Sequence, residues 1–188
     1  MSAYLAEQGM TAMNPALTIT PVGGAQKVSY MVALLTSEDQ SILVLLDQEN
    51  EAAATKDYLV KSRLLADQNV VFVSEAFATA PSEADVDDLL DPAIYKALVL
   101  ECYEIELAGR NLILNPNLPR IAKRIEAGLK ALDFKFHKTR PASLLFRKMA
   151  ADTAKVVTDE SAKRFQALFM TINARLAKHL ARTKGPFQ

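Results

Sequence analysis

An almost uninterrupted apolar run, Ser41-Ile-Leu-Val-Leu-Leu46, constrains the fold of this chain more than any other feature. Such a run is typical of a strand that is buried on both faces of a parallel sheet. A helix is predicted from residue 50 or 51 to about residue 66, and a second strand follows at Asn69-Val-Val-Phe-Val73. A strand, a helix and a strand in this order predict a parallel pair joined by a right-handed crossover. The chain is therefore expected to be an α/β protein.

The residues before this unit extend the same pattern towards the N-terminus. Residues 2–13 are expected to form a short helix that Asn14-Pro15 ends. Leu17-Thr-Ile-Thr20 is a short β-type run, and residues 25–35 have apolar positions spaced as on one face of a helix. The predicted sheet therefore has three parallel strands and is sandwiched by helices.

The second half of the chain is predicted to be helical. The expected helix starts are, in chain order, Asp91-Pro92, Asn117, Pro141 and Thr158, because capping residues and proline favour the first turn. The first of these helices has a predicted buried stripe of Ile94, Leu98, Val99, Cys102 and Ile105, and Gly185-Pro186 is expected to end the last one. We predict an α/β core over residues 1–108 and an added helical region over 109–188.

Composition excludes several classes of protein. The chain has 188 residues, half of them hydrophobic, with one cysteine and two histidines. A disulfide framework and a cysteine- or histidine-based zinc site are therefore not expected. No apolar run is long enough for a membrane span, and no basic segment followed by an apolar core marks a secretory signal. A cytoplasmic protein with no membrane partner is expected.

The net charge of zero conceals an asymmetry between the two halves. Residues 1–100 contain 5 basic and 14 acidic residues, whereas residues 101–188 contain 17 basic and 8 acidic residues. An acidic half beside a basic half is found in metal-dependent enzymes that act on nucleic acids. Simple attraction between the two halves is the alternative.

Acidic residues follow two of the predicted strands, where ligands bind in open parallel sheets. Asp47 and Glu49 come directly after the central apolar strand, and Asp85, Asp87 and Asp88 follow the next strand at a distance of about ten residues. Carboxylate oxygens are the ligands that Mg²⁺ prefers. These five residues are therefore candidate Mg²⁺ or Mn²⁺ ligands. A solvated turn and an Asp-rich helix start would account for them without a metal.

Other positions suit phosphate groups or the protein core. Gly23 and Gly24 precede a predicted helix and would let the backbone approach a phosphate, although a tight turn explains them equally. Lys138 and Arg140 lie in a basic segment with interleaved aromatic residues and could bind a phosphate or stabilise a leaving group. Surface solvation is the alternative for both. Cys102, on an apolar stripe, is expected to belong to the core.

Three segments resemble successive motifs of the Toprim domain, and more narrowly the nuclease half of the overcoming-lysogenisation-defect (OLD) family of ATP-dependent endonucleases. They are Thr20-Pro-Val-Gly-Gly-Ala-Gln-Lys-Val28, Leu43-Val-Leu-Leu-Asp-Gln-Glu49 and Ala84-Asp-Val-Asp-Asp-Leu-Leu-Asp91. The resemblance implies a Toprim-like fold and an Mg²⁺-dependent endonuclease that acts on DNA. It makes Asp47 and Glu49 metal-binding and catalytic residues, and Asp85, Asp87 and Asp88 metal ligands. Lys138 lies where the family tends to carry a late catalytic lysine.

The sequence also departs from the family pattern. Glu49 stands in place of the usual second Asp, and Asp87 stands where a Glu commonly precedes Asp-Leu. The family's opening strand, with its Glu-Gly motif, is not found before Tyr4, so the domain is expected to be truncated there and weakly active or inactive alone. An ABC-type ATPase region, carried by another segment or chain, is the implied partner, and a homo-oligomer is a further expectation.

Three functions follow from these observations. The first is metal-dependent DNA cleavage, with the basic half holding the phosphate backbone. The second is a non-catalytic interaction module that docks on an ATPase partner or on a second copy of the chain. The third is a doubly wound phosphate-binding protein or phosphatase, which would bind small phosphates and have no affinity for DNA.

Overall fold

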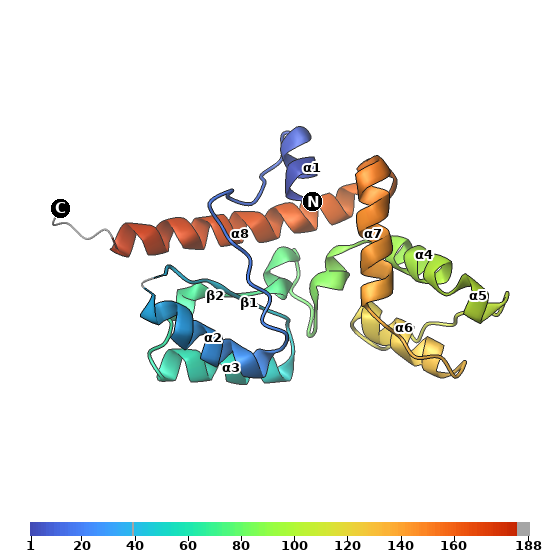
Figure 1. Ribbon diagram of the computed structural model, residues 1–188, viewed down its shortest axis with the longest axis horizontal. Helices are drawn as coiled ribbons and strands as arrows, with labels where there is room; N and C mark the ends of the chain where they lie inside the picture. Colours follow the sequence, from blue (N-terminus) through green and yellow to red (C-terminus); the bar gives the residue numbers. More distant parts are fainter. Residues whose placement is uncertain (39, 184–188) are drawn as a thin grey trace. The chain divides into compact units, whose positions relative to one another are not determined.

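The computed structural model describes residues 1–38 and 40–183, and its helices and strands are labelled in Figure 1. The chain forms two compact units: the first comprises Met1–Ser82 together with the chain from Phe165 onward, and the second comprises Glu83–Arg164. The predicted boundary between residues 108 and 109 falls inside the second unit. The expected helix end at Gly185-Pro186 lies outside the described residues.

The first unit contains a small parallel sheet. Strands β1 (Val44–Leu46) and β2 (Val70–Phe72) pair in parallel, with Val44 opposite Val70 and Leu46 opposite Phe72. Helix α3 (Asn50–Lys61) connects them, and the short helices η1 (Asp67–Asn69) and η2 (Val73–Ala76) flank β2. The predicted strand, helix and parallel strand are therefore confirmed, although both strands are shorter than expected.

The core of the first unit lies between this sheet and two helices. Helix α2 (Ala25–Ser37) packs against α3. The buried members of this core are Val28, Val32, Val44, Leu46, Ala52, Leu59 and Val70. Leu45 is 41% exposed between two buried neighbours, so the expectation that this strand is buried on both faces was wrong. The alternation shows that only one face of β1 meets the core.

The N-terminal expectations were only partly correct. Helix α1 (Ser2–Glu7) is shorter than predicted, and Gly9 follows it with φ +68°. Residues 17–20 form no strand, so the described sheet has two strands instead of three. Ile19 is 69% exposed, and its neighbours have no buried face, so burial does not offset the entropy of ordering a strand here.

Helix α8 (Asp159–Thr183) begins in the second unit and ends in the first. In the first unit, Asn173 accepts from the backbone N–H of Asn14 and donates to the carbonyl of Ala12. Arg175 donates to the carbonyls of Gln68 and Val70, so the helix is tied to the segment that leads into β2. Figure 1 shows α8 on the side of the strands opposite α2 and α3. No helix in the described part of the chain is both long and apolar enough to cross a membrane.

The second unit consists of helices, as predicted for most of it. Its elements are η3 (Val86–Leu89), α4 (Pro92–Cys102), α5 (Glu104–Leu107), α6 (Ile121–Lys130), α7 (Thr139–Asp152) and η4 (Thr153–Lys155). Helix α4 packs against α6 and α7, and buries Tyr95, Leu98 and Val99. Ile105 is 89% exposed, so its place in the predicted buried stripe was wrong. The reason is that α4 ends at Cys102 and the stripe is not continued.

Two of the four predicted helix starts are confirmed by their capping hydrogen bonds, and the other two helices begin at different residues. Asp91 accepts from the N–H of Ala93 at 2.7 Å, and Thr158 Oγ1 accepts from the N–H of Ser161 at 3.2 Å. Helix α7 begins two residues before Pro141, which sits in its first turn. Asn117 does not cap α6, because the helix starts at Ile121.

Gly128 in α6 allows close approach of the preceding segment, and we expect Gly128→Ala to destabilise the protein. A Cβ atom there would lie 2.7 Å from the carbonyl oxygen of Ile113 and 2.8 Å from Leu112 Cδ1. Alanine favours a helix by about 1 kcal/mol, but overpacking costs about 1–3 kcal/mol, so a net loss is expected. Urea unfolding of Gly128→Ala and wild type measures this loss of stability. Exposed Ala127→Gly in the same helix is the control for propensity alone, and a stability gain in Gly128→Ala would contradict the close approach.

Candidate functional site

The acidic segment after residue 82 and the predicted phosphate-binding lysine meet in the second unit. Lys138 Nζ lies 2.7 Å from Asp85 Oδ2 and 3.0 Å from Asp87 Oδ2. The side chain of Asp85 is 4% exposed, whereas that of Lys138 is 53% exposed. One ammonium group therefore binds two carboxylates and still faces solvent. These three predicted site residues are brought together across a sequence separation of 53 positions.

Backbone hydrogen bonds at the start of η3 hold the carboxylates of Asp85 and Asp88 in place. Asp85 Oδ1 accepts from the N–H of Asp87 at 3.1 Å, and Asp88 Oδ2 accepts from the N–H of Asp85 at 2.9 Å. This reciprocal pair is a capping box. Asp88 Oδ1 also accepts from the N–H of Ile121, the first residue of α6, at 2.7 Å. Both oxygens of Asp88 therefore bind backbone, so that Asp88 links η3 to α6.

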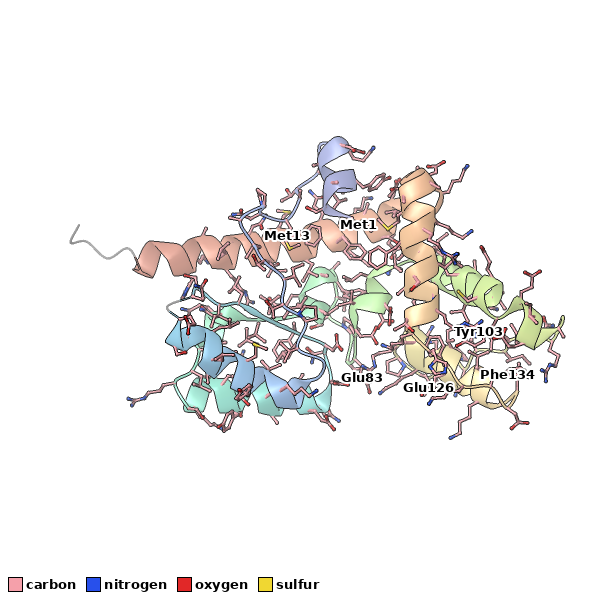
Figure 2. The ribbon with its side chains drawn as sticks, viewed as in Figure 1. Met1, Met13, Glu83, Tyr103, Glu126 and Phe134 are labelled. Carbon is pink, nitrogen blue, oxygen red and sulfur yellow. The ribbon has the colours of Figure 1, made fainter. Side chains whose placement is uncertain are left out.

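Basic residues at the start of α6 complete the network. Arg120 lies with Nε 3.3 Å from Glu83 Oε2 and with Nη1 3.8 Å from Asp85 Oδ2. Lys123 Nζ is 2.5 Å from the same oxygen of Glu83. Glu83, at the start of the second unit, is labelled in Figure 2. We refer to these residues as the acid–base cluster: Glu83, Asp85, Asp87, Asp88, Arg120, Lys123 and Lys138.

Burial and pairing shift several pKa values within the cluster. Burial raises the pKa of Asp87 against the opposing effect of Lys138, and burial also raises the pKa of Asp88 despite its backbone hydrogen bonds. For Lys138, burial alone would lower the pKa, but the hydrogen bond to Asp85 and the charges of Asp87 and Asp85 outweigh it and raise the pKa. Burial, and then the charge of Asp87, raise the pKa of Tyr95 on α4. Lys138 is therefore charged, and Tyr95 protonated, at neutral pH.

The raised pKa of Asp87 predicts a pH dependence of stability. Because the folded pKa lies above the unfolded value near 3.8, the native state binds more protons between the two values. The contribution of Asp87 to stability is thus full below the unfolded pKa and falls as pH rises through the folded pKa, by at most about 1.4 kcal/mol per pH unit. We therefore expect the unfolding free energy of Asp87→Asn minus that of wild type to be larger at pH 7 than at pH 4.

Urea unfolding of both proteins across this pH range measures the difference in unfolding free energy. Comparing the variant with wild type cancels the opposite contribution of Glu83, whose pKa is lowered by its hydrogen bond to Lys123. A difference that stays constant from pH 4 to pH 7 would show that Asp87 has the same pKa in both states.

The segment that carries Lys138 is anchored by a buried tyrosine. Tyr103, at the end of α4, is 1% exposed and lies among the side chains between α4 and α6 (Figure 2). Its hydroxyl donates to the carbonyl of Lys135 at 3.2 Å and accepts from the N–H of His137 at 2.8 Å. Both bonds fix the backbone immediately before Lys138.

Arg140, predicted to bind phosphate, is engaged within the second unit. Its guanidinium forms an ion pair with Glu106 at 2.5 Å, donates to the carbonyl of Cys102 and lies 3.9 Å from the centre of the Tyr103 ring. These contacts join α7 to α4 and α5. In this conformation Arg140 acts as a packing residue, and its phosphate-binding role stays a prediction.

The remaining predicted site residues lie in the first unit. Asp47 follows β1, Glu49 immediately precedes α3, and both are half-buried. Gly23 and Gly24 have φ values of +74° and +124° and immediately precede α2. Only glycine adopts such angles readily, so a turn explains both residues without a phosphate. Their phosphate-binding role stays a prediction.

A metal centre needs several ligating side chains in one place. Within residues 1–38 and 40–183, no group of three or more His, Cys, Asp or Glu side chains is arranged to hold a metal ion. In the acid–base cluster, the Oδ2 atoms of Asp85 and Asp87 bind Lys138, and both oxygens of Asp88 bind backbone. In this arrangement Lys138 and backbone N–H groups occupy these oxygens, and the role of the three carboxylates as metal ligands stays a prediction.

Sequence reasoning missed Glu83, Arg120, Lys123 and Tyr103. Complementary charge was the only sequence signal for the first three, and many residues of this chain share it. Comparison with known proteins adds no further candidates: no family model matches the chain, and no curated protein or solved structure does so either. The Toprim resemblance therefore rests on the sequence motifs alone.

Proposed function

We propose that this chain is the nuclease part of an OLD-type system and cleaves DNA by Mg²⁺-dependent phosphodiester hydrolysis. The observation that carries the proposal is the contact of Lys138 with Asp85 and Asp87. The family resemblance assigns the acidic motif and the late lysine to one catalytic site. Although the two are far apart in sequence, they are adjacent in the structure.

Lys138 supplies positive charge to the proposed site. Its pKa is raised by the hydrogen bond to Asp85 and by the charge of Asp87, against the effect of burial, so the ammonium stays charged at the pH of DNA cleavage. Half of its side chain is exposed, and of its three N–H donors two bind Asp85 and Asp87, which leaves one for a phosphate oxygen. Asp85 and Asp87 are positioning residues that fix the ammonium. A fixed cation beside a phosphodiester stabilises charge that develops in the transition state.

The metal requirement of this proposal depends on Asp47 and Glu49. Carboxylates at a strand end provide the hard oxygen ligands that Mg²⁺ takes, together with water and phosphate oxygens. When bound, the metal would polarise the phosphodiester and activate water. Because the second-unit carboxylates already bind Lys138 and backbone, Asp47 and Glu49 are the residues to test first for metal binding.

Calorimetric titration with Mg²⁺ and Mn²⁺, paired with a cleavage assay on plasmid DNA, tests the proposal. We expect metal binding by the chain, with cleavage that is weak because the family's Glu-Gly strand is not found before Tyr4, and loss of both in Asp47→Ala. Asp57→Ala is the matched control, since Asp57 is an exposed acid of the same unit that pairs with Lys61 at 3.0 Å. Cleavage at the wild-type rate in Asp47→Ala would remove Asp47 from the site.

A non-catalytic module that docks on an ATPase partner is the second candidate. The observation that favours it is the pairing of every carboxylate in the acid–base cluster with a cation or backbone N–H group. Such a closed network suits a structural role. Absence of both metal binding and cleavage in the wild-type chain would select this function over the nuclease.

A further inference from the structure

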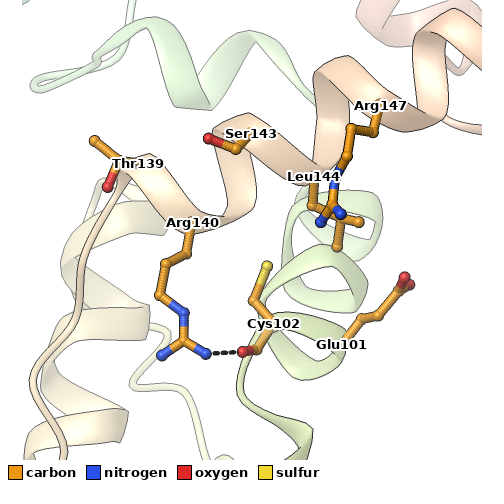
Figure 3. A pocket seen from close by; sticks show the side chains of 7 residues that line it. All are labelled: Glu101, Cys102, Thr139, Arg140, Ser143, Leu144 and Arg147. Atoms are coloured by element: carbon orange, nitrogen blue, oxygen red, sulfur yellow. Dashed lines mark hydrogen bonds between the residues drawn. The ribbon is translucent and has the colours of Figure 1, made fainter.

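A pocket of about 490 Å³ lies between α4 and α7 in the second unit. Among the residues that line it are Glu101, Cys102, Arg140, Ser143, Leu144 and Arg147. Figure 3 shows the two guanidinium groups on either side of Cys102, with Ser143 on the helix above. The volume is within the range of small-molecule sites, about 300–1,000 Å³. Among the residues predicted for the nuclease, Arg140 lines this pocket, whereas Lys138 and the five acidic candidates do not.

Charge pairing leaves one cation of the pocket without a partner. Arg140 pairs with Glu106 at 2.5 Å, and Glu101 pairs with Lys148 at 2.8 Å. Arg147 forms no ion pair with any carboxylate in the described part of the chain. Glu101 is thus neutralised by Lys148, which does not line the pocket. The guanidinium of Arg147, with five N–H donors, faces the pocket without an ion-pair partner in the described part of the chain.

We propose that this pocket binds the phosphate group of a small organic phosphate. The planar fork of a guanidinium matches two phosphate oxygens, and the Ser143 hydroxyl, four residues before Arg147 on the same helix face, can donate to a third. Leu144 gives the pocket an apolar wall, and a phosphate alone would not fill 490 Å³. The remaining space accommodates the organic part of the ligand.

Cys102 supplies a direct readout of occupancy, because it is the one cysteine in the chain and lines the pocket. We would measure the alkylation rate of the full 188-residue chain by neutral iodoacetamide, at rising inorganic phosphate or phenyl phosphate and constant ionic strength. Burial raises the pKa of this thiol, so a mildly alkaline pH gives a measurable rate. We expect saturable protection, with phenyl phosphate acting at lower concentration than phosphate.

Variants distinguish a pocket from general surface charge. Arg147→Gln is expected to raise the phosphate concentration for half-protection about tenfold, and the uncharged change Ser143→Ala about threefold. Glu101→Gln is expected to lower it, because it removes an acid from the pocket wall. Lys130→Gln is the matched control: it makes the same charge change on an exposed residue of α6 outside the pocket, and should have no effect.

Three results would overturn the proposal. The first is equal protection by chloride, and the second is an Arg147→Gln variant that behaves like Lys130→Gln. The third is protection by a short DNA duplex without protection by phosphate or phenyl phosphate, which would make DNA the ligand. None of these measurements uses DNA cleavage, so failure of the nuclease proposal leaves this test intact.

Discussion

Replacing Lys138 by glutamine is expected to lower the rate of DNA cleavage by about 10²-fold or more, a loss typical of removing one preorganised charge or donor from a transition state. Glutamine keeps a polar side chain that is one atom shorter than that of lysine, but removes the charge. The ammonium of Lys138 is held by Asp85 at 2.7 Å and by Asp87 at 3.0 Å. A cation fixed before the substrate arrives needs no reorganisation during the reaction, so its loss should appear in kcat.

Single-turnover cleavage of a labelled duplex measures this effect, and Lys123→Gln is the matched control. Lys123 belongs to the same acid–base cluster and pairs with Glu83 at 2.5 Å, but it does not contact Asp85 or Asp87. We expect Lys123→Gln to alter DNA affinity and its salt dependence while kcat stays near wild type. Lys138→Arg should retain part of the activity, because the charge remains.

Stability has to be followed in parallel, because Lys138 also neutralises a buried acid. Without Lys138, Asp87 should have a still higher pKa, since burial already raises it and the opposing cation is gone. Urea unfolding of each variant separates loss of folding from loss of chemistry. If Lys138→Gln is folded and cleaves DNA as fast as Lys123→Gln, Lys138 has no catalytic role.

Local sequence signals predicted those parts of the fold that depend on neighbouring residues. The apolar run of β1, the helix after it and the strand β2 are close in sequence, and their parallel pairing follows from connection rules. The caps at Asp91 and Thr158 are equally local, since each side chain binds an N–H two or three residues ahead. Leu17–Thr20 had the composition of a strand but lacked a buried face, which sequence alone does not reveal.

Features that depend on distant residues could not be predicted. The first N–H of α6 binds Asp88, which lies 33 residues earlier in the chain. Because a local pattern contains only neighbouring residues, it indicated Asn117 as the cap instead. The return of α8 to the first unit is likewise non-local, and it makes the units differ from the predicted domains. For the candidate site, the sequence indicated Asp85, Asp87 and Lys138 separately, whereas their contact and the part played by Arg120 appear only in the folded chain.

Among the single substitutions considered for the second unit, Tyr103→Ala is expected to cause the largest loss of stability. Tyr103→Ala removes a ring that is 1% exposed and supports both Phe136 and Arg140, so a loss of about 3–5 kcal/mol is expected for a core aromatic residue. Tyr103→Phe keeps the ring but leaves the N–H of His137 without its acceptor, which costs about 1–3 kcal/mol. The phenylalanine variant therefore tests the hydroxyl alone.

Urea unfolding measures both losses, and Tyr30→Phe is the control, because the Tyr30 side chain is 73% exposed and its hydroxyl should contribute little. Hydrogen exchange of the His137 amide gives a local readout: it should exchange faster in Tyr103→Phe. Since His137 directly precedes Lys138, the same variant should also lower DNA cleavage without changing any charge. A His137 amide that exchanges as slowly in Tyr103→Phe as in wild type would show that other contacts hold this segment, and that the position of Lys138 does not depend on Tyr103.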